Sequence, residues 1–295
     1  MSDPGPAPAP APVHPRGLLY LGTPAMAVPA LHALVAAGHH VVGVVTRVDK
    51  RRGRGGEPTP SPVKAAALEL GLPVVHTVDE GVALGADLGV VVAFGQLIKP
   101  HVLAVLPMVN LHFSLLPRWR GAAPVERALL AGDPVTGVCL MQLEQGLDTG
   151  GVYARVEVAI GPDATGDSLR HELVEVGTRV LLDALEAGLG APVPQEGEPT
   201  YAAKLSPDDL RLRHDQPAEA RHRVVRLGGA WTTFRERRLK VHAAEVVDPA
   251  ATGDELVGDV AGGLRLVTVQ PEGKAPMPWR DFANGARPRP GERLV

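Results

Sequence analysis

The sequence predicts an α/β protein with a Rossmann-like, mostly parallel sheet in an N-terminal domain, then a linker and a small C-terminal antiparallel β-barrel domain of OB-like type. Up to about residue 190, short apolar strands alternate with helical segments, which is typical of a parallel sheet covered on both faces. From about residue 221, short strands alternate with glycine turns. The length of 295 residues also favours two domains, because single cores rarely grow beyond roughly 250–300 residues.

Short apolar runs mark the expected strands of the first domain, at residues 17–22, 40–46, 72–76, 87–94 and from 109, with two more inside 135–160. The expected helices lie at residues 23–39, 61–71 and 167–187. Gly38 is a typical stop for the first helix, and Ser61 followed by Pro62 is a typical start for the second. The alternation therefore continues through the whole first domain.

Composition also suggests the domain boundaries. Residues 1–15 hold six prolines and predict a disordered Pro/Ala-rich tail. Residues 16–190 then form the first domain, residues 191–220 a linker rich in Pro, Glu and Asp, and residues 221–295 the second domain.

Composition excludes several classes of protein. The only cysteine, Cys139, lies in an apolar run and is interpreted as a buried hydrophobe, so we expect no disulfide and no zinc site. No apolar run reaches the ~18 residues that a membrane span requires, and the N-terminus lacks a signal segment. We therefore expect a cytoplasmic protein without metal or membrane contacts, and nothing demands more than a monomer.

One segment lies where a dinucleotide fingerprint would lie. In LGTPAMAVP, however, Gly22 is followed by Thr23 and Pro24, which breaks the G-x-G-x-x-G spacing. The chain also has no G-x-x-x-x-G-K-[ST] motif. Both observations disfavour a nicotinamide or nucleoside triphosphate cofactor despite the Rossmann-like order of elements.

The stretch VNLHFSLLP, from residue 109, starts as a buried strand but carries polar side chains. Because strand side chains alternate between faces, Asn110, His112 and Ser114 share one face. Asp148 lies in GLDTGG, a glycine-rich turn between the two strands expected next. Ligands of open α/β sheets bind beyond the carboxyl ends of strands, which makes these residues a candidate site.

These side chains suit acyl transfer to an amine or to water without a metal. Asp148 would orient His112 as a base, and Asn110 would donate to an oxygen that becomes negative. On spacing alone, a purely structural role for His112 is an open alternative. A hydrolase triad of Ser114, His112 and Asp148 is disfavoured, because alternate strand residues lie ~6.8 Å apart and no G-x-S-x-G elbow is present.

Two basic clusters indicate a polyanionic partner. The segment RVDKRRGRGG, residues 47–56, has five basic residues against one acidic residue. Residues 221–242 have seven Lys and Arg against Glu236 alone, interleaved with Trp231 and Phe234. Because the whole chain has a net charge of −3, these local excesses favour contacts with phosphates.

Longer segments resemble the methionyl-tRNA formyltransferase family, and the resemblance covers nearly everything after the tail. NLHFSLLP and GLDTGG mark the broader superfamily that uses formyltetrahydrofolate, whereas TPSPVK, GAWTTF and PEGKAPM resemble the tRNA-specific enzymes. The resemblance implies transfer of a formyl group from 10-formyltetrahydrofolate, as co-substrate, to the α-amino group of methionyl-initiator tRNA in translation initiation. It implies that residues 16–190 are catalytic and that residues 221–295 bind tRNA.

The resemblance also implies roles for individual residues. The catalytic trio would be Asn110, His112 and Asp148. The folate contacts would come from Phe94, Gly95, Ser114, Leu115, Leu116 and Pro117. The tRNA contacts would come from the basic residues Arg51, Arg52, Arg54, Lys64, Arg237, Arg238 and Lys240.

Other functions stay open at this point. A sugar or nucleotide N-formyltransferase, or a hydrolase that uses water to cleave formyltetrahydrofolate, would need the same trio. A non-catalytic RNA-binding protein with an enzyme fold is an alternative of another class. The basic second domain favours a large polyanionic acceptor, and the intact trio favours an enzyme.

Overall fold

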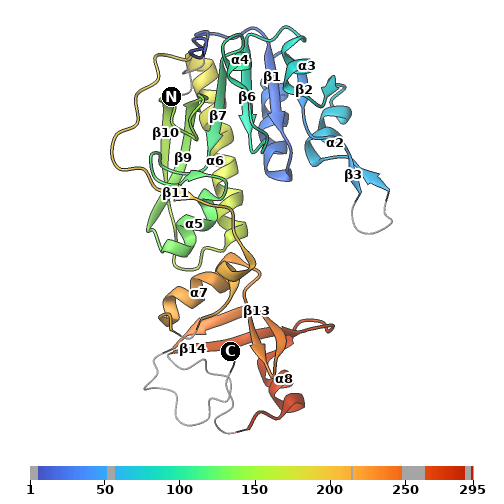
Figure 1. The fold of residues 1–295 in the computed structure, drawn as a ribbon, viewed down its shortest axis with the longest axis vertical. Helices are drawn as coiled ribbons and strands as arrows, with labels where there is room; N and C mark the ends of the chain where they lie inside the picture. The colour runs from blue at the N-terminus through green and yellow to red at the C-terminus, as the bar shows by residue number, and fades with distance from the viewer. Residues whose placement is uncertain (1–5, 52–56, 214, 248–262, 290–293, 295) are drawn as a thin grey trace. The chain divides into compact units, whose positions relative to one another are not determined.

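The chain is described by a computed structural model that covers residues 6–51, 57–213, 215–247, 263–289 and 294. Its contacts divide it into two compact units (Figure 1). The N-terminal unit consists of Met1–Pro124, Val135–Ala159 and Arg170–Ala202, and the C-terminal unit of Val125–Pro134, Ile160–Leu169 and Ala203–Val295. The segment expected to be a linker, residues 191–220, is therefore shared between the two units.

The N-terminal unit contains one seven-stranded sheet. Its strands are β1 (Leu18–Gly22), β2 (Val41–Val45), β5 (Val74–Val75), β6 (Leu88–Val92), β7 (Met108–His112), β9 (Val135–Gln142) and β10 (Val152–Ala159). They lie in the order β10-β9-β7-β6-β1-β2-β5. All neighbours from β7 to β5 are parallel, whereas β9 is antiparallel to both β7 and β10. The predicted Rossmann-like, mostly parallel sheet is confirmed.

Helices cover both faces of this sheet. They are η1 (Ala25–Ala27), α1 (Val28–Ala36), α2 (Pro62–Glu69), α3 (Val78–Val82), α4 (Pro100–Leu103) and α6 (Gly166–Ala187), whereas α5 (Pro124–Ala131) belongs mostly to the C-terminal unit. Gly177 of α6 packs against Val138 and Phe113 on one face, and Gly81 of α3 packs against Leu19 on the other. The predicted cap of α2 is confirmed, because the Ser61 hydroxyl accepts a hydrogen bond from the Lys64 amide at 3.0 Å.

The register of the sheet fixes the face on which the polar residues of β7 lie. Asn110 is paired with Val91 of β6, and Val91 is paired with Leu21 of β1. Leu21 and Val91 belong to the buried cluster that also contains Val78 of α3. Because side chains of paired residues share a face, Asn110 and His112 project toward the side covered by α3 and α4.

The connection between β9 and β10 has to fold back along the sheet. Gln142, the last residue of β9, is paired with Val109, so β9 ends beside the start of β7. His112 lies three residues further along β7, which corresponds to about 10 Å. Residues 143–151 return over this distance, and they bring Asp148 to His112. The sequence predicted that His112 and Asp148 lie at adjacent strand ends. Because β9 is antiparallel to β7, residue 148 reaches the end of β7 only through this fold-back.

The first described residues of the chain lie against the N-terminal unit. The Ala9 amide donates to the Leu103 carbonyl, and the Leu189 amide donates to the Val13 carbonyl, both at 2.8 Å. The part of the expected tail that the structure describes is thus anchored and not free, whereas residues 1–5 lie outside the described residues.

The C-terminal unit contains a four-stranded antiparallel sheet. Its elements are η2 (Pro207–Leu210), α7 (Ala218–Leu227), β12 (Trp231–Phe234), β13 (Arg237–Val246), β14 (Leu264–Pro271), β15 (Met277–Pro278) and α8 (Trp279–Ala286). The sheet has the order β12-β13-β14-β15. The predicted antiparallel β domain is confirmed, although its expected start at residue 221 lies within helix α7. Among the described residues, β12 and β15 are edge strands, so closure into a barrel stays a prediction.

Two further strand pairs and the helix lengths complete the description. Short β3 (Lys50–Arg51) pairs with β4 (Pro58–Thr59), and β8 (Arg120–Gly121) pairs in parallel with β11 (Tyr201–Ala202). In the described part of the chain, no helix combines the length and the apolar character needed to cross a membrane.

The fold-back of residues 143–151 depends on a glycine, and Gly150→Ala tests it. An alanine Cβ at this position would lie 1.9 Å from the Gln142 carbonyl oxygen, a backbone atom. We expect the substitution to lower the free energy of unfolding by about 1–3 kcal/mol. Gly190→Ala is the matched control, because its Cβ would meet nothing within 4 Å. Urea unfolding of both variants checks this, and equal stabilities would contradict a tight fold-back.

Candidate active site

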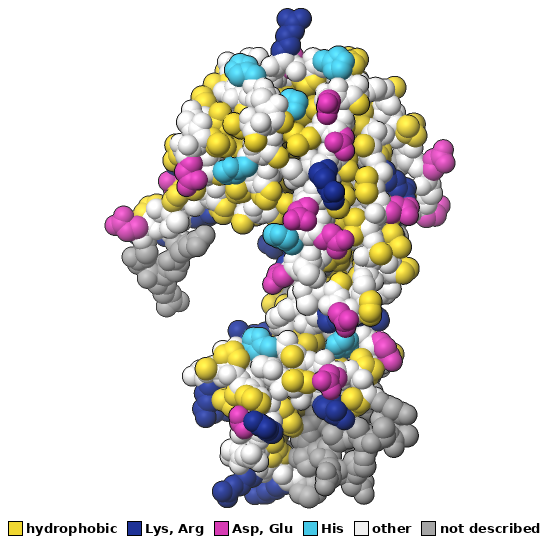
Figure 2. All heavy atoms as spheres, turned by 180° about the vertical axis from the view of Figure 1, so that it is seen from behind, with side chains coloured by type: hydrophobic (Ala, Val, Ile, Leu, Met, Phe, Trp, Pro, Cys, Tyr) yellow, Lys and Arg dark blue, Asp and Glu magenta, His cyan; other side chains and the backbone are white. Residues whose placement is uncertain are grey.

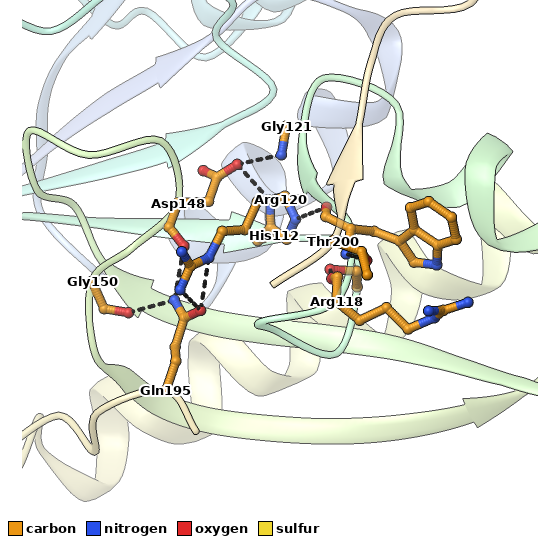
Figure 3. Close-up of polar contacts among 10 residues, drawn as sticks. His112, Arg118, Arg120, Gly121, Asp148, Gly150, Gln195 and Thr200 are labelled. Carbon is orange, nitrogen blue, oxygen red and sulfur yellow. Dashed lines mark hydrogen bonds and ion pairs between the residues drawn. The ribbon is translucent and has the colours of Figure 1, made fainter. Parts of the chain in front are cut away.

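The centre of the site is the buried ring of His112 at the end of β7. Its side chain is 5% exposed. Nε2 donates a hydrogen bond to the Trp119 carbonyl at 2.9 Å, and Nδ1 lies 3.6 Å from Oδ2 of Asp148 (Figure 3). Both ring nitrogens therefore face a defined partner, and the ring has a fixed orientation.

Backbone geometry holds the Asp148 carboxylate. Its Oδ2 accepts a hydrogen bond from the Gly121 amide at 2.7 Å (Figure 3). The side chain is 13% exposed. Asp148 itself has a φ of 50°, in the left-handed region that aspartate tolerates better than most residues. The carboxylate is thus the more exposed member of the pair it forms with His112.

The hydrogen bonds determine where a proton can be added. A carbonyl oxygen only accepts, so Nε2 of His112 carries a hydrogen and Nδ1 is the nitrogen left to bind a proton. Burial lowers the pKa of His112, while the Asp148 charge and the Trp119 carbonyl act in the opposite direction. The ring is therefore neutral at neutral pH, with its free lone pair directed at a carboxylate. This arrangement can take up one proton between the two groups.

Asn110 supplies an uncommitted amide on the same face of β7. It lies two residues before His112 and is half-buried. Its carboxamide makes no hydrogen bond to the part of the chain that the structure describes. A half-buried amide without a protein partner can donate to a ligand oxygen that carries negative charge. The structure thus groups the three residues of the predicted trio on one side of the sheet.

Ser114 is not placed as a nucleophile. Its hydroxyl is buried and donates to the Arg118 carbonyl at 2.6 Å, which closes the loop after β7. His112 is engaged with Trp119 and Asp148 instead. The alternative of a hydrolase triad is therefore contradicted by the geometry.

The residues expected to contact folate differ in accessibility. Ser114, Leu116 and Phe94 are buried, and Leu116 packs against Cys139 in the core. Leu115 and Pro117 are half-buried, and Gly95 is exposed in the loop after β6. The half-buried and exposed residues are therefore accessible to a ligand. The buried residues pack beneath the loops and support their shape.

Several residues of the site escaped the sequence analysis. Trp119 and Gly121 act through a backbone carbonyl and a backbone amide, a role that the residue type does not reveal. Gln195 and Thr200 lie in the expected linker, yet both contact the loops of the site: Gln195 Nε2 donates to the carbonyls of Asp148 and Gly150, each at 2.8 Å, and Thr200 Oγ1 accepts the Trp119 amide at 2.9 Å.

The basic residues expected to contact tRNA fall into three groups. Arg51 is exposed on β3, while Arg52 and Arg54 lie outside the described residues. Lys64 is not a free cation, because its Nζ lies 2.8 Å from Oδ1 of Asp49. The exposed residues of β13 that were expected to bind tRNA are Arg237, Arg238 and Lys240.

Aromatic rings accompany the cations of the C-terminal unit. The Arg238 guanidinium lies 4.4 Å from the centre of the Trp231 ring, and that of Arg211 lies 5.4 Å from it. Figure 2 shows one face of this unit, where Lys and Arg side chains stand beside acidic and hydrophobic ones. Cations on that face are thus mixed with other side chains.

Among the described residues there is no group of three or more His, Cys, Asp or Glu that could hold a metal ion.

Comparisons with known proteins identify the family of the chain. Residues 18–185 match the Formyl transferase family, and residues 204–287 match the Formyl transferase, C-terminal domain family. A methionyl-tRNA formyltransferase from Symbiobacterium thermophilum is 43% identical over 308 residues, which cover 94% of each chain. The chain belongs to the methionyl-tRNA formyltransferase family. A member from Paenarthrobacter aurescens is 44% identical over 294 residues, which cover 91% of this chain and 96% of that relative.

Membership of the methionyl-tRNA formyltransferase family makes the chain a formyltransferase, and solved structures support the fold. Methionyl-tRNA formyltransferase from Clostridium thermocellum matches with a TM-score of 0.59 at 14% identity, covering 86% of this chain and 98% of that chain. HypX from Aquifex aeolicus in complex with tetrahydrofolic acid matches with a TM-score of 0.64 at 17% identity, covering 92% of this chain. The chain spans about half the length of HypX, 47%.

The protonation state of the pair can be measured directly. We expect the ring of His112 to titrate below its reference pKa of about 6.5, because burial disfavours the charged form. Asp148→Asn removes a charge that favours the imidazolium and should lower this pKa further. Nitrogen chemical shifts of labelled histidine, recorded against pH, provide the measurement, with His112→Gln to assign the signal. A higher pKa in Asp148→Asn would contradict the contact between the two groups.

Proposed function

We propose that the chain transfers the formyl group of 10-formyltetrahydrofolate to the α-amino group of methionyl-initiator tRNA. The observation that carries the proposal is the His112–Asp148 pair with the uncommitted carboxamide of Asn110 on the same face of the sheet. The names of the relatives give the aminoacylated tRNA as acceptor, and the folate-bound HypX structure suggests the donor. The proposal implies a cytoplasmic role in translation initiation.

The proposed reaction is a direct transfer without a covalent enzyme intermediate. The neutral amine attacks the formyl carbon, and a carbon–nitrogen bond forms. The Asn110 carboxamide donates to the carbonyl oxygen as that oxygen gains negative charge. The attacking nitrogen then releases a proton to the His112–Asp148 pair. The bond from carbon to N10 of the folate breaks, and the pair returns the proton to N10.

The proposed division of labour differs from the expectation that Asp148 only orients His112, which takes the proton. Nε2 of His112 is occupied by the Trp119 carbonyl, and Nδ1 faces the more exposed Asp148. We therefore assign the proton to the pair as a unit, with the carboxylate on the side of the substrate. Gly95, Leu115 and Pro117 are the accessible candidates for folate contacts.

The charge of the C-terminal unit favours a nucleic acid as acceptor. Arg237, Arg238 and Lys240 lie exposed on one strand, and phosphate contacts with such cations release counterions. A sugar or nucleotide acceptor, or water, would need no such surface. These acceptors remain the alternatives, because the same trio would serve all of these reactions.

The proposed function predicts formyl transfer from labelled 10-formyltetrahydrofolate to methionyl-initiator tRNA. Asn110→Ala should lower kcat by about 10²–10³, because one donor to the developing oxyanion is lost. Asn284→Ala, at an exposed position of α8, is the matched control and should turn over like the wild type.

The same assay separates the alternatives. Methionyl-elongator tRNA, a nucleotide sugar and a reaction without acceptor are the parallel samples. Faster transfer to the nucleotide sugar or to water than to initiator tRNA would overturn the proposed acceptor. Near-wild-type turnover of Asn110→Ala would overturn the proposed oxyanion donor.

The basic strand predicts a salt-dependent contact with tRNA. Arg237→Ala should raise KM for the charged tRNA and reduce the slope of log affinity against log salt by about one, the value expected for one lost phosphate contact. Arg179→Ala, at an exposed position of α6, is the control. Binding measured from 50 to 200 mM salt checks this. An unchanged slope in Arg237→Ala would argue against a phosphate contact at this residue.

A further inference from the structure

Residues 191–202 cross the candidate active site and are fixed at both ends of this crossing. At one end, Val193 and Val152 exchange two backbone hydrogen bonds of 2.9 and 2.7 Å. At the other end, β11 (Tyr201–Ala202) pairs with β8 (Arg120–Gly121) in the loop that follows β7. This segment, called the 191–202 segment below, thus joins the loop that carries Asp148 to the loop that follows His112.

Gln195, between these two ends, uses its whole carboxamide. Nε2 donates to the carbonyls of Asp148 and Gly150, each at 2.8 Å. Oε1 accepts from Nε and Nη2 of Arg120, at 3.1 and 2.7 Å. Figure 3 shows Gln195 between Gly150 and Arg120, with Asp148 beyond them. One side chain therefore ties the Asp148 and Gly150 carbonyls to the Arg120 side chain of β8.

Thr200 holds the residue that orients the imidazole. Its Oγ1 accepts the Trp119 amide at 2.9 Å, and the Trp119 carbonyl accepts Nε2–H of His112 at 2.9 Å. Trp119 has a φ of 62°, a conformation that costs on the order of 1–3 kcal/mol in a residue other than glycine and persists only when its surroundings fix it. The hydrogen bond that the Trp119 amide donates to Thr200 is one of the contacts that fix it.

Ala202 limits the position of the amide that binds Asp148. Gly121 has a φ of 123°, and a Cβ added to it would lie 2.9 Å from the Ala202 carbonyl oxygen. The Gly121 amide donates to Oδ2 of Asp148 at 2.7 Å. The close pairing of Ala202 with Gly121 thus sets the place of this donor.

We infer that Gln195 and Thr200 are positioning residues of the active site: Gln195 places the Asp148 carboxylate, and Thr200 places the Trp119 carbonyl that orients His112. Neither side chain has to touch the substrate. Their effect on the rate rests on the proposed function, whereas their effect on the His112–Asp148 contact does not. A segment that only tethers the chain would add stability without changing this contact.

Gln195→Ala and Thr200→Val test the inference in the full-length protein. Misplacing a catalytic group by about 1 Å can cost up to roughly 10²-fold in rate, so we expect kcat to fall by about 10- to 100-fold. KM for the folate donor should stay within about threefold, because the binding groups are untouched. Thr200→Ser keeps the accepting hydroxyl and should restore kcat.

A second readout follows the imidazole without any substrate. Asp148 and the Trp119 carbonyl both favour the charged ring, so loosening either should lower the pKa of His112. Nitrogen chemical shifts of labelled histidine should show this decrease in Gln195→Ala and Thr200→Val. Gln145→Ala is the matched control, because Gln145 lies in the same loop as Asp148 and its Nε2 donates to the Pro6 carbonyl. If Gln195→Ala does not fold, Gln195→Met keeps the side-chain length and takes its place.

The two readouts separate failure of the inference from failure of the proposed function. A lower melting temperature with unchanged kcat and an unchanged His112 titration would overturn the positioning role. A shifted titration, in a protein whose wild type transfers no formyl group to methionyl-tRNA, would support the positioning role and overturn the proposed acceptor.

Discussion

The contact between a buried imidazole and a nearly buried carboxylate is the constraint that shapes the rest of the site. His112 and Asp148 have lost most of their water, so their orientation has to come from protein groups. A buried polar group left without a partner costs about 1–3 kcal/mol. The Trp119 carbonyl and the Gly121 amide meet this requirement, one for each member of the pair. Backbone donors and acceptors suit this task because they keep their place when side chains move.

This constraint accounts for the unusual backbone around the pair. Trp119 and Asp148, neither of which is a glycine, have positive φ values, and Gly121 also has a positive φ. Each such conformation of a non-glycine residue is unfavourable in isolation and needs a surrounding structure that fixes it. Here the 191–202 segment provides much of that structure through Gln195 and Thr200. The strained residues and the side chains that fix them therefore lie around the group that would accept the proton.

The sequence predicted the elements of this site better than their connections. Period-two alternation placed Asn110 and His112 on one face, and the glycine-rich turn identified Asp148, because these signals are local. The fold-back of Asp148 could not be predicted, since it follows from the antiparallel β9 next to a parallel β7. The 191–202 segment was assigned to a linker from its composition, although Gln195 and Thr200 bind loops that are distant in sequence. Their contacts are mostly with backbone atoms, which leave no trace in the identity of the partner residue.

The low pKa of His112 has a consequence for the order of steps in the proposed reaction. A free α-amino group has a reference pKa of about 7.7–8.0, so a base whose pKa lies below 6.5 is too weak to deprotonate the ammonium form efficiently. At pH 7, however, roughly a tenth to a sixth of such amines are already neutral. Attack by this neutral form makes the nitrogen cationic and far more acidic, and a weak base then suffices. In the proposed reaction, the pair therefore takes its proton during or after carbon–nitrogen bond formation, which agrees with a base kept neutral by burial until the substrate supplies the charge.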